Sequence, residues 1–118
     1  MQNEVDSMFS LDLLFDFYGQ LLTDHQRRIF EAVMFDDRSV SEVAREEGIS
    51  RQSVSDLLKR VREQLEGYES RLGLVGRFRD ERKALGEIRT LAEAALRTGD
   101  MEPVAEILGI VKRLEQME

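Results

Sequence analysis

The side chains best suited to chemistry lie in a short basic segment near the middle of the chain. Arg51, Gln52 and Ser55 would share the outward side of one helix. In the major groove of DNA, arginine pairs with guanine through two hydrogen bonds and glutamine pairs likewise with adenine, while serine, lysine and helix N-termini suit phosphates. The expected DNA-binding residues are Ser50, Arg51, Gln52, Ser53, Ser55, Lys59, Arg60 and Arg62.

The charge distribution favours the same segment. Residues 50–62 contain four basic side chains and one acidic one, Asp56, whereas residues 1–37 contain two basic and eight acidic side chains. A local basic face is the electrostatic footprint of nucleic-acid binding. The net charge of −7 disfavours tight non-specific binding to phosphate, and Asp56 opposes binding within the segment itself. An ordinary solvated helix face therefore stays open as the alternative.

Other kinds of chemistry find little support. His25 is the only histidine and lies in the first turn of an expected helix, which favours a surface or capping role over a metal ligand. The absence of cysteine excludes disulfides and thiolate zinc sites. Two aspartate pairs, Asp12 with Asp16 and Asp36 with Asp37, have no nucleophile or phosphate loop beside them. We expect no enzyme, no cofactor and no metal site.

Capping signals define the helices that must position the basic segment. Thr23 with Gln26 predicts a capping box that opens a helix from residue 24 to about 35. Ser39 with Glu42 repeats this signal and predicts a helix of two turns. Gly48 then stands where a left-handed helix end is expected.

The connection that follows has the pattern of a helix-turn-helix. Ser50 can cap a helix that runs through residue 65 and could continue past residues 67 and 68. Ala44 is the small residue that lets two helices approach, and Gly48 makes the turn. Glu47 departs from the apolar residue often found before that glycine. The residues expected to lock the helices together are Val43, Ile49, Val54 and Leu57.

Helices are also expected on both sides of this motif. Residues 8–22 are apolar on nearly every side, and the aromatic residues here and elsewhere are expected to pack in the core. A second helical pattern begins at about residue 77 and turns at residues 97–100, where Asp100 would cap a last helix. The helix before this turn is expected to have one apolar face, formed by Leu85, Ile88, Leu91, Ala92, Ala95 and Leu96. The helix after the turn is expected to have an apolar stripe formed by Val104, Ile107, Leu108, Val111 and Leu114.

Several of these residues carry a family resemblance. The motif residues 21–26, 39–48, 50–54, 59–60 and 68–69 resemble the YlxM family of small bacterial helix-turn-helix proteins over about residues 8–78. Ser55 stands where we expect an aromatic residue in that family. The family is similar to the promoter-reading fourth region of sigma factors and is associated with the genes of the signal recognition particle. The resemblance implies a regulator of, or accessory to, that pathway.

Together these observations predict an all-α protein: a helix-turn-helix head over residues 1–72, similar to sigma region 4 or winged-helix-like with three to four helices, and a helical hairpin over residues 73–118. We expect a cytoplasmic DNA-binding regulator. The alternative is a factor that binds a protein or ribonucleoprotein, such as a signal recognition particle component, and uses the helix-turn-helix only as a scaffold. The apolar surfaces of residues 8–22 and of the last helix favour a homodimer, although they could instead cover each other within one chain.

Overall fold

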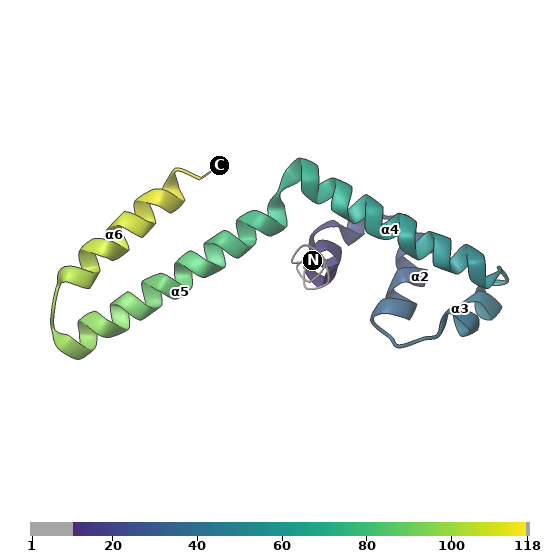
Figure 1. Ribbon diagram of the computed structural model, residues 1–118, viewed down its shortest axis with the longest axis horizontal. Coiled ribbons are helices and arrows are strands. Elements are labelled where there is room, and N and C mark those ends of the chain that lie inside the picture. The colour runs from purple at the N-terminus through teal and green to yellow at the C-terminus, as the bar shows by residue number, and fades with distance from the viewer. Residues whose placement is uncertain (1–10, 118) are drawn as a thin grey trace. The chain divides into compact units, whose positions relative to one another are not determined.

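The computed structural model describes residues 11–117, which form helices and short connections without any strand (Figure 1). The expected helical start at residues 8–10, with Phe9, lies outside the described residues. The chain divides into two compact units, one ending at Val75 and one beginning at Gly76. We call residues 11–75 the head and residues 76–117 the hairpin. Within the described residues, no helix is long and apolar enough to cross a membrane.

The head consists of five helical segments, one of which is the short 3-10 helix η1. Residues 11–18 are helical and lead into η1 (Gly19–Leu21), after which come α2 (Asp24–Met34), α3 (Val40–Glu47) and α4 (Arg51–Leu72). The two helices of the hairpin are α5 (Leu74–Thr98), whose first two residues still belong to the head, and α6 (Glu102–Glu115). This architecture confirms the expected all-α class with a helix-turn-helix and a C-terminal hairpin.

The helix starts follow the capping signals, with one difference. Thr23 and Gln26 form the complete capping box, each side chain bonding the other residue's backbone N–H at 3.1 and 3.0 Å. Ser39 accepts a hydrogen bond from the Glu42 N–H at 3.0 Å, but the Glu42 carboxylate lies 3.4 Å from the Arg38 guanidinium. The second capping box is therefore only half formed, because the glutamate pairs with a charged neighbour.

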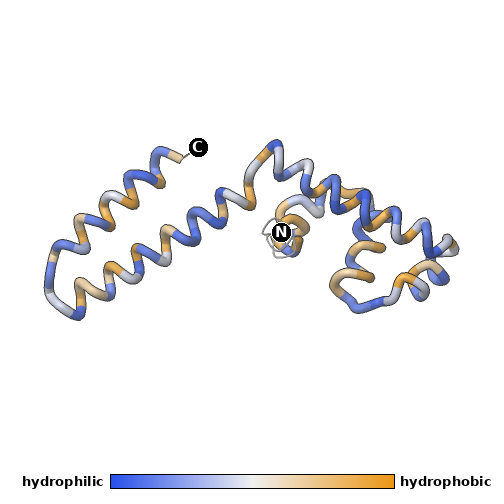
Figure 2. The backbone as a smooth tube through the Cα atoms, in the orientation of Figure 1, coloured by the Kyte–Doolittle hydropathy of each residue, from blue (hydrophilic) through white to orange (hydrophobic). Residues whose placement is uncertain are grey.

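Two clusters of apolar side chains hold the head together, and α4 contributes to both. Val54 joins α2 and α3 in one cluster, which contains Ile29, Val43, Ala44 and Val54. Val61 and Leu65 join α2 and the first helix in the other, which contains Leu11, Leu14, Tyr18, Leu22, Phe30, Val61, Leu65 and Val75. Figure 2 shows apolar and polar residues alternating along α4, as expected for a helix with one buried side. Phe15, Phe30 and Phe35 contact one another beside the second cluster with ring centroids 5.2–6.0 Å apart, which confirms their packing role.

A buried tyrosine connects the first helix to the start of α5. The Tyr18 hydroxyl donates to Glu69 Oε1 at 2.6 Å and accepts from the Leu74 N–H at 3.1 Å. Glu69 Oε1 also accepts from the Val75 N–H at 2.9 Å. These bonds cap α5 directly after Gly73, which ends α4 with φ 64°. For this reason α5 begins at Leu74 and not at about residue 77 as the apolar pattern indicates.

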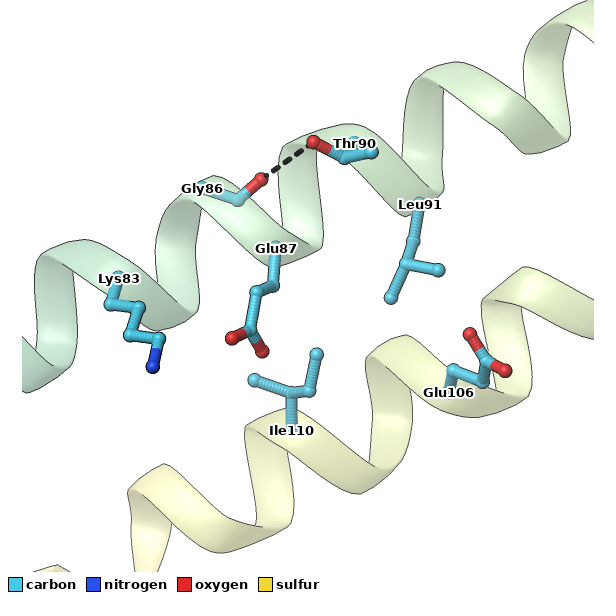
Figure 3. A pocket seen from close by; sticks show the side chains of 7 residues that line it. All are labelled: Lys83, Gly86, Glu87, Thr90, Leu91, Glu106 and Ile110. Carbon is cyan, nitrogen blue, oxygen red and sulfur yellow. Dashed lines mark hydrogen bonds between the residues drawn. The ribbon is translucent and has the colours of Figure 1, made fainter.

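The hairpin is packed much less tightly than the head. Ala84 is its one fully buried apolar residue among those described, and α6 has none. The Asp100 carboxylate accepts from the Glu102 N–H at 3.1 Å, so it caps α6 as expected, from one residue before the Met101 N-cap position. Leu91 and Ile110 face each other between the helices along an open groove of about 600 Å³ (Figure 3).

The exposure of α5 corrects the expected apolar face. Ile88, Leu91 and Ala95 are half-buried, but Leu85 and Leu96 are 54% and 88% exposed. The apolar stripe is wider than the strip that α6 covers, because a single neighbouring helix shields only part of the surface of another.

We predict that Tyr18→Phe destabilises the head by about 1–3 kcal/mol, since it removes the acceptor of the Leu74 N–H and one of the hydrogen bonds that Glu69 Oε1 receives. Burial raises the pKa of Tyr18, and its bond to the Glu69 carboxylate adds to that rise, so the hydroxyl stays protonated at neutral pH. Urea unfolding at pH 7 measures the change. Tyr68→Phe is the matched control, because no hydrogen bond of the Tyr68 hydroxyl is found among the described residues. An equal loss in both variants would contradict this role of Tyr18.

Candidate nucleic-acid interface

The turn between α3 and α4 has the geometry that the sequence indicates. Gly48 ends α3 in the left-handed conformation with φ 71°, and the Ile49 N–H returns to the Ala44 carbonyl at 3.0 Å. Ser50 then caps α4 by accepting from the Ser53 N–H at 3.0 Å. Ala44 and Val54 are buried at the crossing of the two helices, so the backbones approach where the small residue was expected.

Glu47 has a structural purpose that its sequence position does not reveal. Its carboxylate receives two hydrogen bonds from Arg28, at 2.7 Å from Nη2 and 3.1 Å from Nε. The His25 Nδ1 atom lies 3.9 Å from the same carboxylate. These contacts join the end of α3 to the outer side of α2. A charged pair thus takes the place of the apolar contact that is usual before the glycine.

The predicted DNA-binding residues all lie on the first three turns of α4 or at its cap, and all are exposed. At 3.6 residues per turn, five of them fall within an arc of about 100°. We call this set the outward face; it consists of Arg51, Gln52, Ser55, Lys59 and Arg62. In the part of the chain that the structure describes, none of its three basic side chains makes an ion pair. Their charges are therefore available to a ligand.

The remaining three predicted residues are not on this face. Ser50 is the helix cap, and its hydroxyl also donates to Ser53 Oγ at 2.9 Å. Ser53 and Arg60 line a separate groove of about 420 Å³ that is shared with Thr23, His25 and Gln26 at the start of α2. The structure thus divides the predicted set into an outward face on α4 and a groove between α4 and α2.

Asp56 controls the conformation of Gln52. The Gln52 amide Nε2 donates to Asp56 Oδ1 at 2.9 Å, one helical turn further along. This bond uses one of the two amide N–H groups and holds the side chain against the helix. The sequence shows Asp56 only as an opposing charge, although the spacing of four residues is the signal for such a pair.

The electrostatics at Glu47 lead to a prediction about acid stability. The hydrogen bonds from Arg28 hold the pKa of Glu47 below its ordinary value, so the folded state favours the carboxylate. Its stabilising contribution is full above about pH 5 and is lost as the pH falls through about 4.3 and below. We predict that the thermal unfolding midpoint falls less between about pH 5 and about pH 3 in Glu47→Gln than in the wild type. Glu63→Gln is the control, an exposed glutamate without an ion pair among the described residues. If the two variants respond alike, the Arg28–Glu47 pair has no such role.

Comparison with known proteins places the chain in a family. Residues 5–102 match the UPF0122 family model, described as "Putative helix-turn-helix protein, YlxM / p13 like". A UPF0122 protein of Thermoanaerobacter sp. (strain X514) is 41% identical over 109 residues, covering 92% of this chain and 91% of that protein. Others from Desulforamulus reducens and Halalkalibacterium halodurans are 36% and 33% identical, covering 88% and 97% of this chain and 89% and 99% of theirs. The chain belongs to the UPF0122 family of YlxM / p13-like helix-turn-helix proteins.

Proposed function

We propose that this protein is a cytoplasmic DNA-binding regulator, without enzymatic activity, that reads duplex DNA with the outward face of α4. The observation that carries the proposal is the exposure of Arg51, Gln52 and Ser55 on one side of the helix that follows the turn. In helix-turn-helix proteins the start of this helix enters the major groove. The buried row of α4 holds that start rigidly against α2 and α3.

Each group on the outward face has a role that suits its chemistry. Arg51 can pair with guanine through two hydrogen bonds, and Gln52 can pair with adenine once it leaves Asp56. Lys59 and Arg62, further along the same face, suit the phosphate backbone. The Ser50 cap satisfies the Ser53 N–H, whereas the first two amides of α4 have no partner among the described residues and can receive a phosphate.

The acidic remainder of the chain gives this binding a particular character. A net charge of −7 weakens attraction to any duplex, so specific contacts must supply a large share of the affinity. A single head offers little contact area. We therefore propose a homodimer, in which two heads reach successive major grooves and together bind a two-part site.

We predict that Arg51→Ala lowers affinity for the preferred sequence by about 1–3 kcal/mol and relaxes the preference at one base pair. Lys59→Ala should weaken all sequences alike and reduce the salt dependence. Selection from random duplexes, followed by fluorescence anisotropy at two salt concentrations, measures both effects. Arg79→Ala controls for the loss of one positive charge, since Arg79 lies outside the head. If selection enriches no motif with the wild type, base reading by this face is wrong.

A second candidate function is supported by the acidic surface of the head. The side chains of Asp12, Asp16, Asp24, Asp36 and Asp37 are all exposed. Such a surface would attract a basic protein or ribonucleoprotein, and the family resemblance suggests a component of the signal recognition particle or its receptor. The helix-turn-helix would then serve only as a scaffold. A purified candidate partner that binds at moderate salt, while no duplex binds even at low salt, would favour this function over DNA reading.

A further inference from the structure

The hairpin exposes more apolar surface than its own two helices can bury. It carries large apolar side chains on α5, on α6 and at the N-cap of α6, whose exposed fractions are 54% for Leu85, 88% for Leu96, 69% for Met101, 40% for Val104 and 55% for Leu108. Scattered exposed leucines are normal on protein surfaces, but contiguous rows of them mark interaction sites. We therefore asked whether these residues form rows.

The exposed residues form one row on each helix. On α5, the exposed Leu85 and Leu96 and the half-buried Ala92 between them are spaced by seven and four residues and so lie on one side. On α6, Val104 and Leu108 are four residues apart, and Met101 precedes them by three. On each helix, this row is about a quarter of a turn around the helix axis from the row that faces the other helix. On both helices the rotation is in the direction in which successive residues advance toward the C-terminus.

Because α5 and α6 run antiparallel (Figure 1), rotations of the same sense lead to the same side of the hairpin. The two rows therefore form one apolar face, which we call the open face; it consists of Leu85, Ala92, Leu96, Met101, Val104 and Leu108. The open groove of Figure 3 lies on the other side of the hairpin, where Lys83, Glu87, Thr90 and Glu106 line it together with Leu91 and Ile110.

The open face needs a cover for the hairpin to be stable. With Ala84 as its one fully buried residue among those described, the hairpin has almost no core of its own. Units of fewer than about 40–70 residues without disulfides or metals usually depend on oligomerisation. The chain has no cysteine, and the described residues contain no group of three potential metal ligands.

We infer that the open face is the interface of the homodimer, where two hairpins pack face to face as a four-helix bundle around a two-fold axis. This inference rests on the homodimer of the proposed function and names its contact surface. A second copy fits because the six residues of the face are aliphatic side chains and methionine, while the nearest exposed charges, Arg89 on α5 and Glu115 on α6, have opposite signs and do not form a patch of one sign that would repel a second copy.

The size of the open face suits such a contact. The row on α5 runs from Leu85 to Leu96, a separation of eleven residues or about 17 Å at 1.5 Å per residue, and neighbouring side chains extend it to roughly 25 Å. Two packed helices are about 20 Å wide, so each copy contributes on the order of 500 Å². Two faces together then reach about 1,000 Å², the lower bound for a specific interface.

Charge introduced into the open face tests the inference. Sedimentation equilibrium of the full chain should give twice 13.7 kDa for the wild type at micromolar concentration. Leu85→Glu and Leu108→Glu should each lower dimer affinity more than about hundredfold, because each buries two like charges at the contact. Thr90→Glu is the control, since it adds the same charge to an exposed position of α5 on the groove side and should remain a dimer.

Chemical crosslinking gives a test that does not depend on charged variants folding well. Because the chain has no cysteine, a single Leu108→Cys substitution provides one thiol on the open face, and Thr90→Cys provides one on the groove side. A short bismaleimide should join two copies of Leu108→Cys and leave Thr90→Cys uncrosslinked. Circular dichroism checks that both variants remain helical.

The outcomes separate this inference from the broader proposal. A mass of 13.7 kDa for the wild type would overturn both the homodimer and its interface. A dimer that withstands both glutamate substitutions, or that crosslinks through Thr90→Cys and not through Leu108→Cys, would overturn the interface and leave the homodimer. The DNA selection experiment is read independently, because the outward face of α4 contributes no residue to the open face.

Discussion

The structure of the head depends on one constraint, that a single side of α4 must be buried in two clusters at once. Val54 contacts α2 and α3, while Val61 and Leu65, two turns and more further along, contact the first helix and α2. A helix held along this length cannot rotate without exposing one of the clusters. The exposed surface of its first turns is therefore fixed in space, and Arg51 and Gln52 lie on it.

Polar contacts then set details that apolar packing leaves free. The Arg28–Glu47 pair joins the end of α3 to α2, and the hydrogen bonds of Tyr18 and Glu69 start α5 directly after Gly73. Both use groups that a simple apolar pattern does not include. They add direction to the packing, because a hydrogen bond tolerates less change in angle than an apolar contact does.

The two units differ in how they satisfy the need for burial. The head buries complete apolar clusters, so its surface is free to be polar and to present a binding face. The hairpin leaves its leucines exposed and has almost no core. This difference fits the proposals that the head recognises DNA and that the open face joins two copies of the chain. In such an arrangement the spacing of the two heads, and hence of the two halves of a DNA site, would depend on the assembled hairpins.

The sequence by itself determined the helices and the helix-turn-helix, because capping and helix ends depend on neighbouring residues. Thr23, Ser50 and Gly48 act within four residues of their own positions, and their roles were predicted correctly. Only the tertiary structure decided the partners of Glu47 and Tyr18, which lie 19 and 51 residues away from them in sequence, and the groove that Arg60 shares with the start of α2. The exposure of Leu85 and Leu96 was likewise decided by the position of α6. Periodicity shows that a helix has an apolar side, but how much of that side a neighbour covers depends on contacts between segments distant in the chain.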